Sequence, residues 1–208
     1  MEEKILLAKY GSDKTPLKLG NLELECYVLE DGTRVFSGRE IQKALGSKST
    51  SGQWLSTYIN EGPLASRFSQ DISKITERIN NPIKFRRNNA GGSQVATNGY
   101  DVTLLVDICS VILDADREKI EVDPQIVMNA DIIIRSVAKV GIIALVDEAT
   151  GYQYDREKYE LQQILNKYIS EELLPWTKSF PDVLYKELFR LNGWDLTVNG
   201  IHKRPSII

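Results

Sequence analysis

The sequence of 208 residues has few of the side chains that most often build catalytic and metal sites. Its single histidine is His202, and its two cysteines, Cys26 and Cys109, lie far apart. These residues cannot supply four tetrahedral ligands for structural zinc, nor a Ser-His-Asp triad. Walker A and dinucleotide-binding fingerprints are also missing. The sequence therefore predicts a protein that is not an enzyme and that uses no metal and no cofactor.

Long hydrophobic runs and a signal-like N-terminus are missing as well. The most apolar run, Val137–Val146, is too short to span a bilayer, and Asp131, Arg135 and Lys139 interrupt any longer one. Without a targeting signal, the two cysteines are predicted to be reduced and buried. The chain is thus predicted to be cytoplasmic, with no membrane partner.

The chain also has no excess of positive charge. Its net charge at pH 7 is −3, which argues against indiscriminate binding of nucleic acid. The charges are unevenly distributed, however. Residues 1–100 hold 14 Lys and Arg against 11 Asp and Glu, a balance of +3, and residues 101–208 hold 12 against 18, a balance of −6. This asymmetry indicates two surfaces with different partners, unless it reflects only a solvated mixture of charges.

The N-terminal half has the patterns of a β-hairpin and a capped helix. Apolar and polar residues alternate over Leu22–Leu29, an Asp-Gly turn follows, and Arg34–Phe36 has the composition of a returning strand. Ser37 has the position of a helix N-cap, and Glu40 three residues later completes a capping box. These patterns predict a small antiparallel sheet with short helices.

From about residue 101 onward, the pattern is helical. Apolar residues at helical spacing predict one helix to about Asp116, and Pro124 fits the first turn of a second that ends near Val146. The second has apolar residues on nearly every side, which predicts a central, covered helix. The fold class is therefore predicted as α+β, with a helical bundle in the C-terminal half. We expect one globule with a mobile segment at 1–20, an α+β part at 21–120 and a helical part at 121–208.

The best candidate for a functional surface is the segment KFRRNNAGG, which begins at Lys84. It is predicted to be a strand followed by a turn, with Lys84, Arg86 and Arg87 as a nucleic-acid-binding set. Arginine matches phosphate and guanine edges, Phe85 could stack on a base, and glycines let a backbone approach closely. The alternative interpretation is a solvated hairpin with Phe85 packed inward.

The string DEATGY, which begins at Asp147, offers two carboxylates in a predicted turn. One acidic pair does not make a metal or acid–base site, so the string is interpreted as structural. Asp147 or Glu148 would accept from backbone donors, Gly151 would take a positive φ, and Tyr152 and Tyr154 would pack onto the neighbouring helix. A carboxylate-based metal enzyme remains a third alternative, with Asp147 and Glu148 as the pair to inspect.

Four strings carry a resemblance to a known family: CYVLEDGTRVFSGREIQKALG at 26–46, DEATGYQYDRE at 147–157, LPWTKSFPDVLYKELFRLNGW at 174–194 and RPSII at 204–208. They resemble the bacteriophage P63C (p-sixty-three C-terminal) domain family, which phages, prophages and other mobile elements carry. The family has no defined activity, so the resemblance implies a context. The first string is also loosely similar to N-terminal modules of phage antirepressors. Family members continue beyond RPSII, which implies that this chain is truncated and that its last residues pack poorly.

Two function hypotheses follow, from different classes. The first is a phage-associated regulatory module that binds DNA through its basic N-terminal hairpin, with the helical half serving as a homo-oligomer contact or a partner site. The second is a protein–protein interaction module that engages a host or phage protein and has no nucleic-acid role. A contiguous basic patch would favour the first, and an exposed apolar patch would favour the second.

Overall fold

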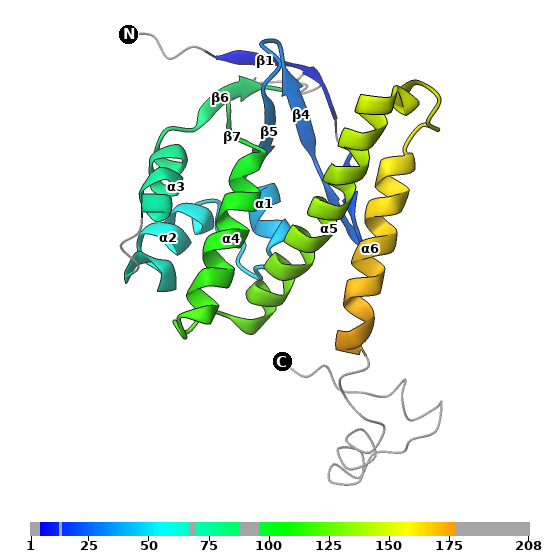
Figure 1. Ribbon diagram of the computed structural model, residues 1–208. Coiled ribbons are helices and arrows are strands. Elements are labelled where there is room, and N and C mark those ends of the chain that lie inside the picture. Colours follow the sequence, from blue (N-terminus) through cyan, green and yellow to red (C-terminus); the bar gives the residue numbers. More distant parts are fainter. Residues whose placement is uncertain (1–4, 13, 67–69, 88–95, 178–208) are drawn as a thin grey trace, which may run out of the picture. The chain divides into compact units, whose positions relative to one another are not determined.

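The computed structural model describes residues 5–12, 14–66, 70–87 and 96–177 (Figure 1). The chain divides into two units, Met1–Ile169 and Ser170–Ile208. Within the first unit, α4 (Thr103–Arg117) packs along α5 (Pro124–Thr150). As predicted, the fold class is α+β, with sheets in the N-terminal half and helices in the C-terminal half.

The longer strands of the first unit close into a barrel. Every neighbouring pair is antiparallel except β6 and β1, which close the barrel by a parallel pairing with Leu6 opposite Phe85. Alternate residues point inward, so a strand buries one side chain in two. The interior side chains are Leu6, Ala8, Tyr27, Leu29, Val35 and Phe85. The strand order is β1 (Leu6–Tyr10), β4 (Cys26–Leu29), β5 (Arg34–Ser37), β7 (Thr97–Asp101) and β6 (Ile83–Arg86).

Strand β1 lies within the segment 1–20 that we expected to be a mobile tail. Its sequence is LLAKY, with Leu6 and Ala8 buried and Leu7 and Lys9 exposed. Five residues are too few to show a clear period in the sequence. The hydrogen bonds that hold the strand come from β4 and β6, which follow much later in the chain. Long-range pairing therefore orders a segment whose local pattern is weak.

The predicted hairpin is confirmed, with one refinement. β4 and β5 pair antiparallel, with Cys26 opposite Phe36, across the Asp-Gly turn. The expected first strand is divided at Glu25 into β3 (Leu22–Leu24) and β4, because β3 pairs instead with β2 (Leu17–Leu19) in a separate two-stranded sheet. Gly20 allows the tight turn of that second hairpin through a φ of +59°.

The predicted N-cap of α1 (Gly38–Ala44) is also confirmed. The Ser37 hydroxyl accepts a hydrogen bond from the Glu40 backbone N–H at 3.3 Å. The Glu40 carboxylate accepts from the Glu25 backbone N–H at 3.0 Å and lies 3.9 Å from Lys43 Nζ. Glu40 therefore anchors the helix to the junction between β3 and β4, which is a tertiary role that the capping-box pattern did not predict.

The remaining helices lie between β5 and β6 and after α5 in the chain. Between β5 and β6 the chain forms α2 (Trp54–Asn60), η1 (Pro63–Ser66) and α3 (Gln70–Asn80). After α5 come η2 (Tyr152–Tyr154) and α6 (Glu160–Thr177), of which the part up to Ile169 belongs to the first unit. In the part of the chain that the structure describes, no helix is long and apolar enough to cross a membrane.

Helix α5 begins where Pro124 predicts but continues past Val146 to Thr150. Asp123 caps it by accepting from the Gln125 backbone N–H at 2.8 Å. Gly151 ends it with a φ of +81°, as expected for a left-handed C-cap. The acidic string at Asp147 therefore forms the last turn of a helix and not a loop.

Candidate functional site

On strand β6, the side chain of Phe85 points into the barrel, and those of Lys84 and Arg86 point out of it. Phe85 is fully buried inside the barrel, with its ring 5.3 Å from that of Tyr27. Lys84 and Arg86, one position before and after it, point outward because strand residues alternate. The inward interpretation of Phe85 is thus correct, and stacking of this ring on a base is excluded.

Arg87 is separated from the other two basic residues. Its Nη1 donates to Glu25 Oε2 at 3.2 Å, and its guanidinium carbon lies 5.8 Å from the centre of the Tyr27 ring. Glu25 lies at the junction of β3 and β4, so this ion pair connects the end of β6 to the opposite part of the barrel. Arg87 is thus already paired with Glu25, although its Nε, like that of Arg86, is buried without a hydrogen-bond partner among the described residues.

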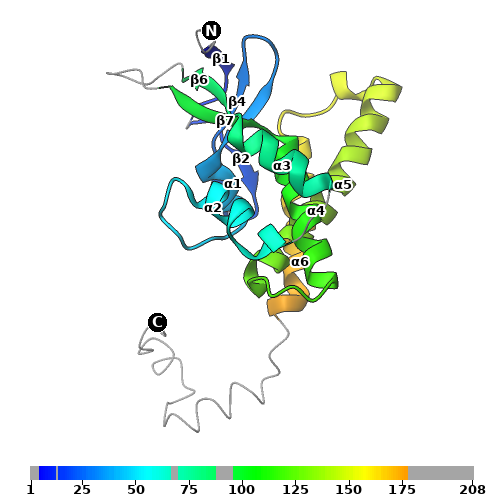
Figure 2. The ribbon, with the colours of Figure 1, turned by 90° about the vertical axis from the view of Figure 1, so that its left-hand side faces the viewer.

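Lys9 is exposed on β1, the strand that pairs with β6. The parallel register sets Leu7 opposite Arg86, and Lys9 follows at an irregularity in the pairing of β1 with β4, with its Nζ 5.5 Å from the centre of the Tyr10 ring. Figure 2 shows β1 and β6 at the edge of the barrel that lies away from α4. We call Lys9, Lys84 and Arg86 the β1–β6 basic face. The turn at 88–95, which carries the predicted glycines, lies outside the described residues.

The side chains of the basic face differ in the hydrogen bonds that they already make within the protein. Lys84 Nζ donates to Asn98 Oδ1 on β7 at 2.6 Å. Arg86 Nε is buried and has no hydrogen-bond partner among the described residues. Because Arg86 Nε is enclosed by the protein, a phosphate would have to contact the other nitrogens of this guanidinium group.

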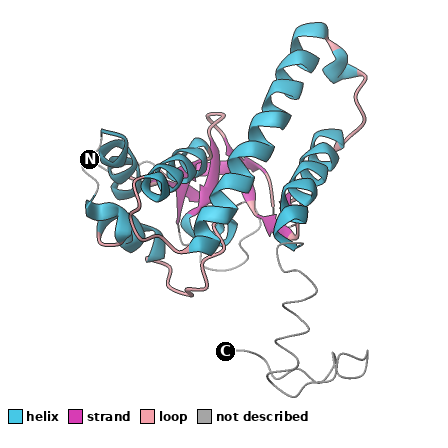
Figure 3. Ribbon diagram, turned by 60° about the horizontal axis from the view of Figure 1, so that its bottom comes forward, coloured by secondary structure: helices cyan, strands magenta, loops and turns pink. Residues whose placement is uncertain are grey.

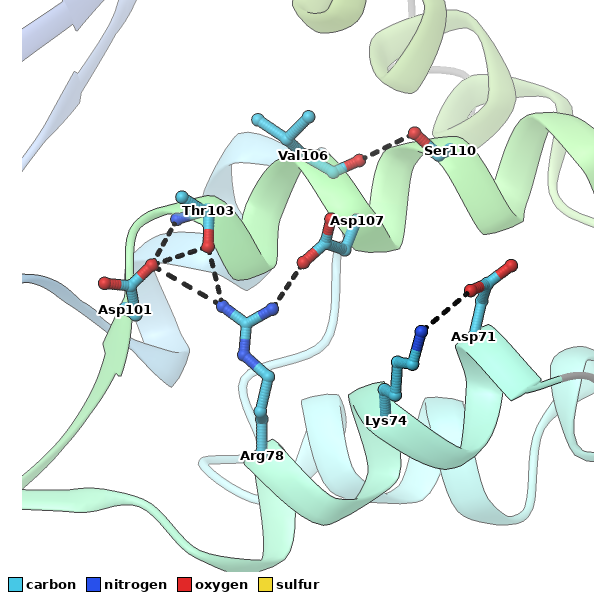
Figure 4. A network of polar contacts seen from close by, with 8 residues as sticks. All are labelled: Asp71, Lys74, Arg78, Asp101, Thr103, Val106, Asp107 and Ser110. Atoms are coloured by element: carbon cyan, nitrogen blue, oxygen red, sulfur yellow. Dashed lines mark hydrogen bonds and ion pairs between the residues drawn. The ribbon is translucent and has the colours of Figure 1, made fainter.

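The two basic residues of α3, Lys74 and Arg78, form ion pairs with carboxylates (Figure 4). Arg78 on α3 lies 3.5 Å from Asp101 and forms an ion pair with Asp107. It also donates to the Thr103 hydroxyl at 2.9 Å. This network ties α3 to the start of α4, so Arg78 holds the fold together and does not extend the basic face. Lys74 lies 3.9 Å from Asp71 on its own helix.

The acidic pair at the end of α5 does not form a catalytic arrangement in the structure. Asp147 is buried and binds Arg156 through Oδ2 at 2.7 Å, with the side chains 12 % and 20 % exposed. Glu148, the next residue, is exposed. Tyr152 and Tyr154 are 49 % and 84 % exposed, so the expectation that they pack onto a helix is wrong. Within the described residues, no group of three or more His, Cys, Asp or Glu could hold a metal.

A cavity of 630 Å³ opens between the barrel and helices α4, α5 and the first part of α6. Its lining is mostly apolar, and Cys26, Arg34 and Thr103 supply polar groups. Burial raises the pKa of the Cys26 thiol, and the charge of Glu40 adds to the rise. Because a protonated thiol is a weak nucleophile, this cavity suits an apolar ligand or side chain better than a reaction.

The second half of α5 is apolar and exposed, which corrects the expectation of a helix covered on nearly every side. Ala138, Ile142, Leu145 and Ala149 follow one another at spacings of four, three and four residues, and we call them the α5 stripe. Ile142 and Leu145 are 60 % and 62 % exposed. Figure 3 shows this half of the long helix extending clear of the sheet. The hydrophobic pattern cannot distinguish a covered helix from one with an unmatched face.

The end of α6 decides the context of the chain. Residues 164–208 match the model of the P63C domain, which defines a phage-associated family. The C-terminal part of the chain is therefore similar to a phage-associated domain. Within the P63C match, residues 164–177 are the described end of α6, and the expectation for the last residues, RPSII, lies outside the described part of the chain.

The comparisons limit what the P63C domain explains. No curated protein and no solved structure matches the chain. The match to the P63C model stops short of the barrel, so the similarity of residues 26–46 to phage antirepressor modules gains no support. The function of the barrel has to be argued from its own residues.

Proposed function

We propose that this chain is a phage-associated regulatory protein that binds nucleic acid, and DNA in particular, through the β1–β6 basic face. The observation that carries the proposal is the outward placement of Lys84 and Arg86 on β6, with Lys9 exposed on the adjacent strand β1. Phosphates accept from such donors on any sequence, and counterion release then drives binding. The proposed activity is binding without catalysis.

The size of the basic face sets the expected behaviour. Three cations contact about three phosphates, so log K should fall with log salt with a slope of about −2 to −3 for duplex DNA. Affinity should therefore be modest at low salt and nearly lost at physiological salt. The overall charge of −3 acts in the same direction, because it repels the rest of the polyanion.

Fluorescence anisotropy with random-sequence duplex and single-stranded DNA, over a salt series, tests the proposal. Lys84→Glu with Arg86→Glu should abolish binding. Arg117→Glu with Lys119→Glu changes the net charge equally on an exposed surface at the end of α4 and should leave most of the binding. Arg87→Gln should change stability more than affinity, because Arg87 is paired with Glu25. Equal losses in both double variants would contradict the assignment of the face.

A second candidate function is supported by the α5 stripe. Exposed apolar residues of this kind are typical of a surface that binds another protein, and they lie on α5 beside its acidic C-terminal end. Two results together would favour an interaction module without a nucleic-acid role. The chain would bind neither duplex nor single-stranded DNA at low salt, and its binding to other proteins would depend on Leu145.

A further inference from the structure

The α5 stripe lies on a side of the helix that carries no charged residue along the length of the stripe. Between Arg135 and Asp147 the only charged residue is Lys139, whose Nζ lies 4.7 Å from the centre of the Tyr168 ring of α6. Lys139 thus belongs to the side that faces α6. The stripe itself runs for about three helical turns, from Ala138 to Ala149. Only an apolar surface of similar length can cover it without burying a charge.

The stripe is symmetric about its own midpoint. Moving outward in either direction, a large side chain comes first and a small one follows. A patch with this property matches a second copy of itself related by a two-fold axis. The two pairs, from the centre outward, are Ile142 and Leu145, and Ala138 and Ala149.

We propose that two copies of this chain form an antiparallel dimer through their α5 stripes. Ile142 of one copy packs against Leu145 of the other, and Ala138 packs against Ala149. The spacing of four, three and four residues is that of a coiled-coil seam, in which such side chains interlock. Gly141 lies on the edge of the seam with open space beside it, so the two backbones can approach closely.

Charge complementarity favours the antiparallel arrangement over a parallel one. Arg135 holds Asp131 of its own helix at 2.9 Å and is exposed at one end of the stripe, and Glu148 is exposed at the other. In the antiparallel dimer, Arg135 of each copy comes within about one turn of Glu148 of the other. A parallel dimer would bring the two Glu148 carboxylates together, which is unfavourable.

The dimer rests on the α5 stripe alone and is independent of the nucleic-acid proposal. A single pair of helices covers less area than a standard interface, so a Kd on the order of 10 µM is expected. The association should therefore appear within the concentration range of ordinary solution measurements.

Sedimentation velocity of the full chain over a concentration series tests the dimer directly. The sedimentation coefficient is expected to rise with protein concentration from the value of a monomer to that of a dimer. Leu145→Glu should weaken the association at least tenfold, whereas Leu7→Glu, which introduces the same charge at a leucine that is 50 % exposed on β1, should leave it unchanged. A wild-type chain that stays monomeric throughout, or equal weakening by both variants, would overturn the proposal.

Cysteine cross-linking tests the direction of the helices. Ala138→Cys and Ala149→Cys proteins, each in a Cys26→Ala background, are mixed and mildly oxidised. The antiparallel pairing predicts a disulfide between the two different variants. It predicts none between two copies of one variant, because equivalent positions lie about 16 Å apart along the axis. Cross-linking of each variant with itself alone would refute the arrangement.

A charge exchange tests the register. Glu148→Arg should weaken the dimer about tenfold, and adding Arg135→Glu should restore it, while Glu121→Arg, an exposed change before α5, should have no effect. A Cys introduced at Ala138 that resists labelling in a monomeric protein would show that another segment or partner covers the stripe, and this would also overturn the dimer.

Discussion

Phe85 packs directly against Gly99 inside the barrel, and this contact leaves no room for a larger residue at position 99. Gly99 on β7 lies opposite Ile83 and Ser37. A Cβ at this position would lie 2.9 Å from Phe85 Cδ1 and 3.3 Å from Val35 Cβ. The first distance is shorter than contacts between carbon atoms allow, and Phe85 has no free space to move because it is fully buried.

Gly99→Ala should therefore destabilise the protein by about 2 kcal/mol, within the range of about 1–3 kcal/mol for an overpacked core. Phe85→Leu alone should cost about 1–2 kcal/mol, because a smaller side chain leaves part of the barrel unfilled. In the double variant, the leucine gives the new methyl group room. The two changes should then cost at least 1 kcal/mol less together than the sum of the single changes.

Urea unfolding followed by circular dichroism measures these free energies, at a protein concentration low enough to keep the chain monomeric. Gly141→Ala provides the matched control: this glycine lies within α5 with open space beside it, so the change should stabilise the helix by about 0.5–1 kcal/mol. Costs for Gly99→Ala and Phe85→Leu that simply add would refute the argument, because additivity would mean that the two side chains do not compete for space.

Three further predictions concern caps, ion pairs and pH. Ser37→Ala should cost about 1 kcal/mol in urea unfolding, whereas Ser37→Asp should retain the cap of α1; equal losses would contradict the capping role. Arg156→Met should cost about 2 kcal/mol because it leaves the mostly buried Asp147 carboxylate without its cation, and adding Asp147→Leu should recover part of the loss. Burial raises the pKa of Tyr58 and of Cys109 to about 12, with the charge of Asp123 adding to the shift of Tyr58. Both groups stay protonated in the folded state while the unfolded chain ionises, so stability should fall from about pH 9 towards pH 12. Tyr58→Phe should make this fall less steep in unfolding curves measured at each pH, and an unchanged slope would refute the assignment.

Sequence patterns were most reliable where local chemistry decides the structure. The Asp-Gly hairpin, the Ser37 cap, the start of α5 at Pro124 and the positive φ of Gly151 were all predicted, because each depends on a few neighbouring residues. The end of α5 was placed too early, near Val146, because the acidic string after it was interpreted as a turn. The predictions failed at β1, where the bonds come from distant strands. They also failed for Tyr152 and Tyr154, whose packing partner was assumed from aromatic character alone.

The candidate site shows the same division. The basic residues of β6 were found from composition, and the strand was predicted, so the outward direction of Lys84 and Arg86 follows from alternation once Phe85 is known to be inside. The sequence does not show that Glu25 binds Arg87, or that the strand with Lys9 pairs with β6. These contacts arise from a parallel closure between the first strand and one that follows far later in the chain.

The sequence by itself determined the helices, the hairpin, their caps and the α+β class, because hydrogen bonds and steric limits between near neighbours act in any fold. Only the tertiary structure decided which of the basic residues share a face and which apolar residues of α5 remain exposed. Those outcomes depend on what each side chain meets across the barrel or the neighbouring helix. A hydrophobic period records that a side chain is apolar and does not record whether anything covers it.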